Sequence, residues 1–535
     1  MASSFLPRAV HFVKENAVWP GCLNLIVGLV LVTGLAVSFK FVQNYYSSPL
    51  KSFPGPLCTN FTDLWRYFKT AGGSVHLVHA DLHRKYGPAV RVGPNALSLS
   101  DPSLLKLVYN TKNPWKKSNM YKVQESVRPD GTSQPNLFST SDEKWHATVM
   151  RPVSSYLSSN KSVLSVEKFL DNSIALLLRI LNEKFVNTGR PCDIADWFVR
   201  FSWDAMGDTT FGAPLGFLDG SLKNSEVLLR DSDRDFDYFA KTSQMPWLHY
   251  ILKTNRIARA LRAPQLEWAV NLSFGHYSKR LQMRTQQQNE KPETKIQHDF
   301  LDKYLEAQQK YPELIDHGQM IGYLLTNTVA GSHPAAYTLT ALVYYVLKTK
   351  GVYEKIGDEL ASVGLLGFSE PVSYKQAKSL VYLEAVIREA IRIHPGFSLI
   401  LEREVPAELG ESGEKGNGHS GLVLPDGRFV PSGTIVGMDA WVINRNEDIF
   451  GPNPDSFVPE RWLPFHDERR DFAEYRLKKM FNTVLSFGMG ARIELVNPDK
   501  EMKITNSWTL RTEDVELVLR RNQSNAKVRQ ALCLK

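Results

Sequence analysis

The chain contains little cysteine. Four cysteines are spread over 535 residues, at Cys22, Cys58, Cys192 and Cys533, and no two of them form a C-x-x-C pair. This spacing excludes a disulfide framework and a cysteine-based zinc site. We therefore expect a reducing environment, of the kind that faces the cytosol.

The chain also lacks a strong excess of one charge. Its 64 lysines and arginines against 56 aspartates and glutamates give a formal net charge of +8. We find no dense basic patch with a nucleic-acid reading motif, so we expect no nucleic-acid partner. A mildly basic face suits anionic lipid or an acidic protein partner better. We find no internal repeat and no low-complexity tract.

Long hydrophobic runs are equally scarce, and one stands out near the start. Residues 21–39 read GCLNLIVGLVLVTGLAVSF and carry no charged side chain. This length is close to the ~20 residues that a helix needs to cross a bilayer. We predict an N-terminal segment at residues 1–20 and a transmembrane anchor at 21–39. A secretory signal peptide is the alternative, but its apolar run usually spans only about 7–15 residues.

The anchor is followed by a proline-rich stretch. Pro54-Gly55-Pro56 closes a segment that we interpret as a hinge, residues 40–56, because two prolines around a glycine stop a helix. No long linker divides the remaining chain, so residues 57–535 are predicted to form one large domain. A single membrane span excludes a transporter.

Helical periodicity dominates this domain. Apolar residues recur at helical spacing over residues 163–185, 265–287, 298–311, 320–348 and 380–393. Strand-like alternation is confined to residues 89–100, which read as a hairpin, and to the region 421–438. The predicted fold class is mainly α with a small β region.

Three ordered motifs occur in the second half of the chain. Glu389-x-x-Arg392 places two opposite charges on one helix face. Sixty-nine residues on (461 − 392) Arg461 stands in FVPERW, and 26 further (487 − 461) Phe487 opens FGMGAR, which ends at Arg492. A Glu–Arg pair alone is usually a surface ion pair, but the ordered set is far more specific.

These motifs resemble those of the cytochrome P-450 family of haem-thiolate monooxygenases: the ExxR helix, the PERW segment and the start of the cysteine loop. Phrases such as SFPGP and HRKYGP resemble fungal members, in particular the pisatin-demethylase-like group. The resemblance implies haem b with its iron, and electrons from NADPH through a cytochrome reductase. It also implies a lipophilic small-molecule substrate of secondary metabolism. The expected location is the endoplasmic reticulum membrane, with a single-pass anchor and the catalytic body facing the cytosol.

The resemblance also implies roles for individual residues. Glu389, Arg392 and Arg461 are expected to form a buried structural triad behind the haem. The cofactor-binding candidates are Arg403, Arg492 and Arg151, together with Trp145, Phe487 and Gly331. A guanidinium suits a haem carboxylate because its planar fork can bond both oxygens. An ordinary surface charge is the alternative for each arginine.

The pattern breaks after Arg492. The family loop carries a cysteine two residues beyond its arginine, but this chain has Glu494 there and lacks the glycine that follows. Residues 493–508 resemble the last β-hairpin of the family, which normally follows a long helix. We interpret the break as a deletion of the axial cysteine and of that helix, so no metal ligand is predicted. A carboxylate does not replace a thiolate, which pushes electron density onto the iron.

A second departure lies in the long helix at residues 320–348. The family pattern places an acid and two alcohols after a glycine, whereas this chain reads Gly331-Ser332-His333-Pro334-Ala335. His333 is a candidate proton carrier because imidazole titrates near neutral pH, and Ser332 is a weaker candidate donor. The alternative for His333 is a side chain that merely faces a groove.

Two hypotheses follow from these departures. In the first, the complete gene product is a monooxygenase and the segment after Arg492 has been lost from this chain. In the second, the chain is a catalytically dead pseudoenzyme that serves as an anchored scaffold.

Overall fold

The computed structural model describes most of the 535 residues. The described residues are 18–46, 48–127, 133–154, 156, 160–254, 267–288, 299–365, 371–407, 420–486, 503–507, 509–513, 516–522 and 529–533. Residues 487–502, which contain Phe487 and Arg492, therefore lie outside the described part of the chain.

The described body is mainly helical, as predicted. Its longer helices are α2 (Val18–Tyr46), α3 (Leu64–Ala71), α4 (Val75–Tyr86), α6 (Glu143–Met150), α8 (Asn160–Leu181), α9 (Ile194–Phe211), α10 (Ser225–Thr242), α11 (Pro246–Thr254), α13 (Glu267–Gln288), α14 (Phe300–Lys310), α15 (His317–Lys348), α16 (Val352–Ser362), α18 (Val381–Ile393) and α21 (Arg470–Thr483). The shorter helices are α5 (Leu105–Val108), α17 (Tyr374–Ala377), α19 (Ala440–Ile443) and α20 (Glu447–Phe450), with single turns at η1 (Leu57–Asn60), η2 (Pro102–Leu104), η3 (Asn119–Gln124), η4 (Asn182–Val186) and η6 (Pro459–Trp462).

Short strands make up the β region. They are β1 (Ala89–Gly93), β2 (Ala96–Leu99), β3 (Ser126–Val127), β4 (Ser133–Gln134), β5 (Cys192–Asp193), β6 (Arg403–Glu404), β7 (Gly421–Val423), β8 (Phe429–Pro431), β9 (Ile435–Gly437), β11 (Lys503–Ser507), β12 (Thr509–Glu513), β13 (Glu516–Asn522) and β14 (Arg529–Cys533). The predicted hairpin at residues 89–100 is β1–β2, and the region 421–438 supplies β7, β8 and β9. The predicted fold class is thereby confirmed.

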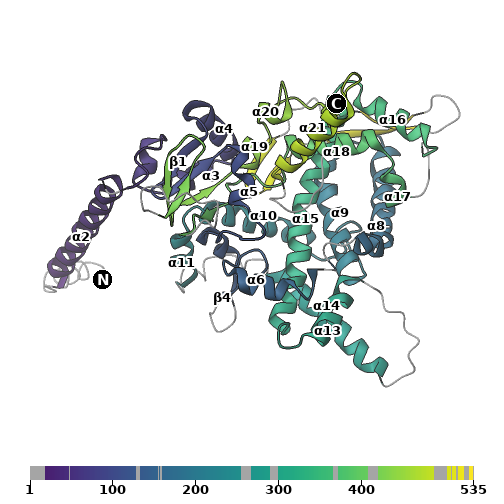
Figure 1. Cartoon of the computed structure of the whole chain (residues 1–535). Coiled ribbons are helices and arrows are strands. Elements are labelled where there is room, and N and C mark those ends of the chain that lie inside the picture. Colours follow the sequence, from purple (N-terminus) through teal and green to yellow (C-terminus); the bar gives the residue numbers. More distant parts are fainter. Residues whose placement is uncertain are drawn as a thin grey trace, which may run out of the picture.

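Helix α15 runs through the centre of the body (Figure 1). The carboxylate of Asp316 caps its first turn by accepting a hydrogen bond from the Gln319 amide at 2.7 Å. Helix α9 packs along α15, and α18 crosses near its C-terminal half. Helix α15 is therefore enclosed by other helices, and Pro334 lies within α15.

The largest sheet links the start of the chain to the region before α19. Its strand order is β1-β2-β9-β6, with β2 parallel to β9 and the other pairs antiparallel. Residues of the predicted hinge are fixed against this sheet, because the Arg91 amide donates to the Pro54 carbonyl at 2.8 Å. A Cβ on Gly55 would stand 2.2 Å from the Arg91 carbonyl oxygen, so only glycine fits there.

The helix at the predicted anchor is longer than the apolar run. Helix α2 extends to Tyr46, so residues 40–46 of the predicted hinge are helical, since no proline or glycine interrupts them. The ring of Tyr45 stacks on Phe61 of the body at 5.4 Å between centroids. Among the described residues, no helix is found that is long and apolar enough to cross a membrane. The transmembrane anchor thus stays a prediction.

The strands after residue 502 pack on the body. Strands β11 and β12 form an antiparallel hairpin, close to the one predicted at residues 493–508. Strand β13 pairs with β14 and also with β5, the strand that leads into α9. Leu517 of β13 is fully buried in an apolar cluster with Cys192. The C-terminal segment therefore completes a sheet that begins over 300 residues earlier in the chain.

Three buried histidines line one side of α4, where it meets α19. His76 is 1% exposed and lies edge-on to the Trp441 ring at 4.6 Å between centroids. His83 contacts the Ser98 hydroxyl through Nε2 at 2.7 Å and the Gly87 carbonyl through Nδ1 at 2.9 Å. Burial lowers the pKa of His76 and of His83 to about 4. Both imidazoles are therefore neutral in the folded chain at neutral pH.

These two histidines predict a loss of stability in acid. Between pH 6.5 and about pH 4 the unfolded chain binds protons that the folded chain excludes, so stability falls as the pH falls through this window. We expect the melting temperature of the double variant His76→Gln, His83→Gln to fall less from pH 7 to pH 5 than that of the unmodified chain. Melting curves at the two pH values measure this, and equal losses in both proteins would contradict it.

Candidate functional site

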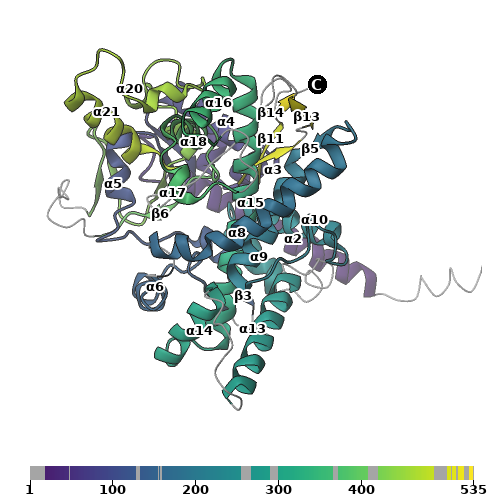
Figure 2. The ribbon, with the colours of Figure 1, turned by 90° about the vertical axis from the view of Figure 1, so that its right-hand side faces the viewer.

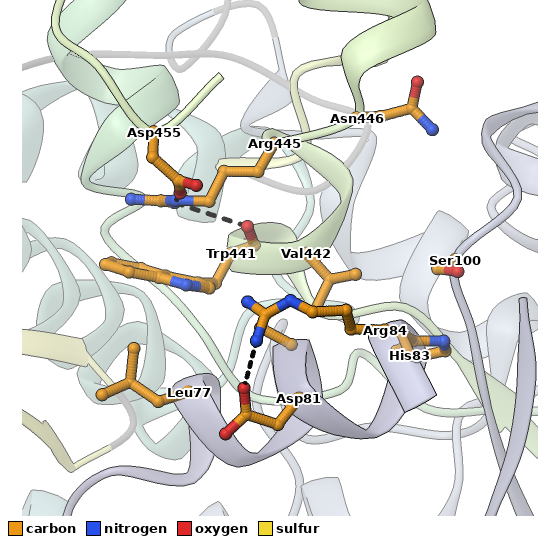
Figure 3. A pocket seen from close by; sticks show the side chains of 11 residues that line it. Leu77, Asp81, His83, Arg84, Ser100, Trp441, Val442, Arg445, Asn446 and Asp455 are labelled. Carbon is orange, nitrogen blue, oxygen red and sulfur yellow. Dashed lines mark hydrogen bonds and ion pairs between the residues drawn. The ribbon is translucent and has the colours of Figure 1, made fainter. Parts of the chain in front are cut away.

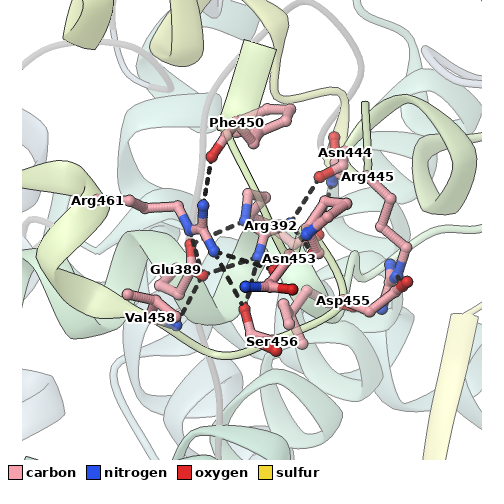
Figure 4. A network of polar contacts seen from close by, with 12 residues as sticks. Glu389, Arg392, Asn444, Arg445, Phe450, Asn453, Asp455, Ser456, Val458 and Arg461 are labelled. Atoms are coloured by element: carbon pink, nitrogen blue, oxygen red, sulfur yellow. Dashed lines mark hydrogen bonds and ion pairs between the residues drawn. The ribbon is translucent and has the colours of Figure 1, made fainter. Parts of the chain in front are cut away.

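The carboxylate of Glu389 lies at the centre of a buried polar network (Figure 4). Its Oε1 accepts hydrogen bonds from Arg392 Nη2 and from Arg461 Nε, each at 2.8 Å. Its Oε2 accepts from Arg392 Nε at 2.8 Å and from Trp462 Nε1 at 2.9 Å. The Val458 amide adds a fifth donor at 2.9 Å. A segment that lies 69 to 73 positions further along the sequence is thereby joined to α18.

The two arginines use their remaining donors on backbone carbonyls. Arg392 Nη1 donates to the carbonyls of Asn444 and Pro454, at 2.8 and 2.6 Å. Arg461 donates to the Phe450 carbonyl. Burial raises the pKa of Glu389, but Arg392 and Arg461 outweigh burial and hold it below its usual range. The network therefore contains an ionised carboxylate with all its partners in place.

This network reaches the last residue before the undescribed loop. Asn444 Nδ2 donates to the Arg392 carbonyl at 3.1 Å and to Ser486 Oγ at 2.8 Å. Asn444 Oδ1 accepts from the Leu485 amide at 2.9 Å. The strand that leads into the predicted cysteine loop is thus held in register by the same side chains that hold α18.

Arg403 of β6 lies in a second polar cluster. Its Nη1 donates to Tyr121 Oη at 3.0 Å and to the Glu402 carbonyl at 2.9 Å. Its guanidinium also lies over the rings of Tyr109 and Tyr121, at 5.3 and 5.6 Å from their centroids. Although burial lowers the pKa of Arg403, the nearby phenol groups raise it overall. Arg403 is thus a partly buried cation that contacts Tyr109, Tyr121 and the Glu402 carbonyl.

Lys117 adds a second cation to this cluster. The β-bridge between Lys117 and Arg403 places them side by side, and Lys117 Nζ donates to the Phe138 carbonyl at 3.1 Å. Burial and the charge of Arg403 lower the pKa of Lys117 to about 8. Two adjacent cations with a phenol donor between them form a cluster that suits a carboxylate. We call Lys117, Tyr121 and Arg403 the cationic cluster.

Helix α6 lies next to the cationic cluster. Glu143, in its first turn, carries a negative charge that favours a higher pKa for both Lys117 and Arg403. Trp145 is partly buried, two residues further along α6, whereas Arg151 is exposed beyond the helix end. The structure therefore places Trp145 on the helix that borders the cluster, and Arg151 at the surface.

The predicted residues of α15 lie away from the cationic cluster. Ser332 Oγ donates to the Thr328 carbonyl at 2.5 Å and is fully buried. His333 is 1% exposed, with Nε2 at 3.4 Å from Asp233 Oδ1 of α10. A Cβ on Gly331 would stand 2.7 Å from Met206 of α9, so Gly331 permits the close approach of the two helices. Within this structure Gly331 serves helix packing.

An apolar cluster lies between the cationic cluster and α15. Its buried members come from α4, η3, α10 and the loop before β6, and they are Val75, Met120, Tyr121, Val123, Phe236, Phe239, Ala240 and Leu399. Phe138, Val329 and Phe397 pack against it. The ring of Tyr121 contacts Phe138 at 5.1 Å, and Phe236 contacts His333 at 5.0 Å. Aromatic and aliphatic side chains thus fill the space between the two sets of predicted residues.

A pocket lies away from the predicted site residues. A pocket of about 480 Å³ lies between α4 and α19 (Figure 3) and is lined by Leu77, Ala80, Asp81, His83, Arg84, Ser100, Trp441, Val442, Arg445, Asn446 and Asp455. None of the predicted site residues lines it. Arg445 lies flat over the Trp441 ring at 3.4 Å and pairs with Asp455 at 2.8 Å. Arg84 pairs with Asp81 at 2.6 Å, so the cations of this pocket already have partners.

This chain belongs to a class of mainly helical oxidoreductases. The family model described as Cytochrome P-450 matches residues 52–493. The chain is 33% identical to the cytochrome P-450 monooxygenase cfoH of Aspergillus candidus, over 91% of each chain. It is 31% identical to cicH of Emericella nidulans, over 86% of this chain and 91% of the relative, and 30% identical to vrtE of Penicillium aethiopicum, over 91% and 88%. The chain belongs to the cytochrome P-450 family and is by family a monooxygenase.

The family uses haem iron, and the described residues fit only part of that group. The cationic cluster suits the haem carboxylates. Of the two cysteines whose side chains the structure describes, neither suits the iron, because Cys58 is exposed in η1 and burial raises the pKa of Cys192 to about 12. Among the described residues, no group of three or more His, Cys, Asp or Glu is arranged to hold a metal ion. We therefore derive no reaction step through haem for this chain.

Sequence reasoning missed several residues of these networks. Lys117 and Tyr121 lie in a segment without a motif, and they reach Arg403 only through the fold. Asn444 stands 52 positions from Arg392. Its one sequence signal is its place shortly before the FVPERW segment.

The Glu389 network predicts a sharp difference between two glutamates of α18. We expect Glu389→Ala to cost about 3–5 kcal/mol of stability, because it leaves two buried cations without their partner. Glu384 pairs with Arg388 on the same helix with its side chain 45% exposed, so Glu384→Ala should cost less than about 1 kcal/mol. Denaturant unfolding of both variants measures the difference, and similar losses would refute the central role of Glu389.

Proposed function

We propose that the complete product of this gene is a membrane-bound, haem-dependent monooxygenase. It would oxidise a lipophilic small molecule in fungal secondary metabolism, as in the pisatin-demethylase-like group. One observation carries the proposal. The family match ends at residue 493, yet the strands beyond it still pack on the body through β13 and the buried Leu517. A segment lost between Arg492 and Ile493 accounts for both facts.

The described residues support one part of this function, the binding of the haem carboxylates. The cationic cluster would hold the haem carboxylates through Arg403, Lys117 and the Tyr121 hydroxyl. In the complete product a cysteine thiolate would hold the haem iron and would supply it with electron density. The lipophilic substrate is proposed from the family, because the apolar cluster beside α15 is closely packed core.

The proposed partners follow from the family. Electrons would come from NADPH through a membrane-bound cytochrome reductase. The location would be the endoplasmic reticulum membrane, with residues 21–39 as a single-pass anchor and the body facing the cytosol. The uncharged sequence of residues 21–39 and the absence of any C-x-x-C pair support this placement.

A pseudoenzyme is the second candidate. It is favoured by the coincidence of two departures: Glu494 at the expected cysteine position, and His333-Pro334-Ala335 in place of an acid and two alcohols. In this case the chain as it stands would be an anchored, haem-free scaffold. The intact Glu389 network is compatible with both candidates, because it stabilises the fold and touches no substrate.

The two candidates differ in the transcript and in the absorbance of haem. We expect the transcript across the codons for residues 489–497 to encode an additional segment with a cysteine, a glycine and a helix. The protein translated from it should show the thiolate–haem absorbance of the reduced carbon monoxide complex. A transcript that matches the present chain, with no haem absorbance after haem is added, would establish the scaffold instead.

The anchor gives a separate prediction. Removal of residues 1–46 should move the protein from the membrane pellet to the supernatant, because it removes the 19 uncharged residues at 21–39. Fractionation of both forms after high-salt washing measures this. A truncated form that stays in the pellet without aggregating would show that a second surface binds lipid.

A further inference from the structure

A buried ion pair lies next to the cationic cluster. Arg66 of α3 is 7% exposed, and its Nη2 donates to Oε1 of Glu402, which is 3% exposed. The other carboxylate oxygen of Glu402 accepts a hydrogen bond from the Ser118 hydroxyl. Asp63 adds a longer contact, with its Oδ1 at 3.7 Å from Arg66 Nη1. Both oxygens of Glu402 are therefore satisfied, by residues from segments as far as 336 positions apart.

The backbone connects this ion pair to both cations of the cluster. Glu402 immediately precedes Arg403, and Ser118 immediately follows Lys117. Because Lys117 and Arg403 form an antiparallel bridge, the residue after the first stands opposite the residue before the second. The hydrogen bond between the side chains of Ser118 and Glu402 joins these opposite residues. The position of each cation is thus tied to the buried ion pair through its neighbour in the chain.

Ser118 also fixes the third member of the cluster. Its hydroxyl oxygen accepts a hydrogen bond from the Met120 amide at 3.2 Å, at the start of η3. Tyr121 lies in η3, and its hydroxyl oxygen accepts from Arg403 Nη1 at 3.0 Å. One serine therefore supports both the buried ion pair and the turn that presents the phenol group.

The cations of the cluster keep donors for a ligand. Among the described residues, both hydrogen bonds of Arg403 leave from Nη1, so its Nε and Nη2 have no hydrogen-bond acceptor there. Lys117 donates to the Phe138 carbonyl, and an ammonium group has three donors. Both cations are partly exposed, so a ligand can reach them. The cluster is thus held in place on one side and free to donate on another.

The negative charge of Glu402 would oppose an anion at this place. Burial raises the pKa of Tyr121, Arg403 lowers it, and the charge of Glu402 adds to the rise, so this carboxylate acts on the cluster. Like charges repel, and a buried charge without a partner is costly. Arg66 balances Glu402 through the direct ion pair. Its helix α3 lies at the end of the body next to α2, on the far side of the molecule in Figure 2.

We propose that Arg66 and Glu402 are positioning residues for the cationic cluster, which they hold ready for the carboxylates of a tetrapyrrole. The ion pair fixes the arrangement of the three donor side chains and keeps the nearby carboxylate balanced. The class of ligand rests on the function proposed above. The ion pair itself does not, because all its contacts lie within the protein.

The first test uses the full chain in detergent, with metal-free protoporphyrin IX as the ligand. This tetrapyrrole has two free carboxylates and no iron, so its binding needs no cysteine. Its dimethyl ester, in which both carboxylates are blocked, is the matched control ligand. We expect the diacid to bind at least about tenfold more tightly than the ester, because only the diacid accepts charge-assisted hydrogen bonds. Titrations followed by porphyrin fluorescence measure both dissociation constants, and equal constants would overturn the proposal.

The second test compares the buried ion pair with an exposed one two residues further along. Lys116 pairs with Glu404 at 2.7 Å, where the two side chains are 58% and 37% exposed. We expect Arg66→Ala to reduce the preference for the diacid at least about fivefold, because it leaves a buried carboxylate without its partner. Lys116→Ala removes the same charge but should change the preference less than about twofold. Equal losses in the two variants would refute the role of Arg66.

A rescue separates positioning from a general loss of structure. In the double variant Arg66→Ala, Glu402→Gln the negative charge is absent, and the new amide oxygen can still accept from Ser118. We expect this variant to prefer the diacid at least about threefold more than Arg66→Ala does, since residues in direct contact are energetically coupled. A double variant that is no better than Arg66→Ala would show a purely structural pair and overturn the proposal.

A further variant covers the case in which Arg66→Ala does not fold, which melting curves will show. Ser118→Ala removes a hydrogen bond to Glu402 and leaves the ion pair in place. We expect it to reduce the preference for the diacid at least about threefold, because the lost bond involves a charged oxygen. A folded Ser118→Ala variant with an unchanged preference would count against the proposal.

These tests and those of the proposed function can fail separately. A complete product without haem absorbance, together with a preference for the diacid that depends on Arg66, would overturn the monooxygenase and leave the positioning pair. A complete product that binds haem, together with a preference that does not depend on Arg66, would overturn the positioning pair alone.

Discussion

The ionised carboxylate of Glu389, buried behind five donors, is the group on which the rest of the site depends. Its oxygens join α18 to the segment that carries Val458, Arg461 and Trp462. An isolated buried carboxylate would be costly, but each lone pair here meets an N–H group. The buried charge is therefore stable only when α18 and the segment with Val458, Arg461 and Trp462 have both folded into place.

The same network extends to the place where the family pattern fails. Through Asn444 it fixes Leu485 and Ser486, immediately before the undescribed residues 487–502. The approach to the cysteine loop is thus built in full although the cysteine itself does not occur in the sequence. Because every donor and acceptor of the described network belongs to the protein itself, its presence supports the family and the fold but not the activity. Only the residues after Arg492 distinguish an enzyme from a scaffold.

The sequence predicted the parts of this protein that depend on local pattern. Helices α8, α13, α14, α15 and α18 lie within a few residues of the predicted ranges because their apolar faces repeat at helical spacing, and α15 begins only three residues before its predicted start, at the Asp316 cap. Helices α9 and α10 were not predicted. The extent of the hinge was wrong, because helix formation continues to Tyr46 and because Pro54 and Gly55 pack against β1. The partners of Arg403 could not be predicted, since Lys117 and Tyr121 come from a region about 280 positions earlier. Contacts of that range are set by the tertiary fold, and no spacing rule reveals them.

The centre of α15 shows how a changed motif alters the side-chain contacts of a helix. Read along one helix, Gly331-Ser332-His333-Pro334-Ala335 has lost the acid and both alcohols. In the fold, the Asp233 carboxylate of α10 lies beside His333 Nε2, and the same carboxylate oxygen accepts a hydrogen bond from the Tyr337 hydroxyl. Pro334 has no N–H group, so it leaves the Ala330 carbonyl without its usual helical donor. The changed motif therefore gives His333 and Tyr337 a shared contact with α10, and it does not by itself separate an enzyme from a scaffold.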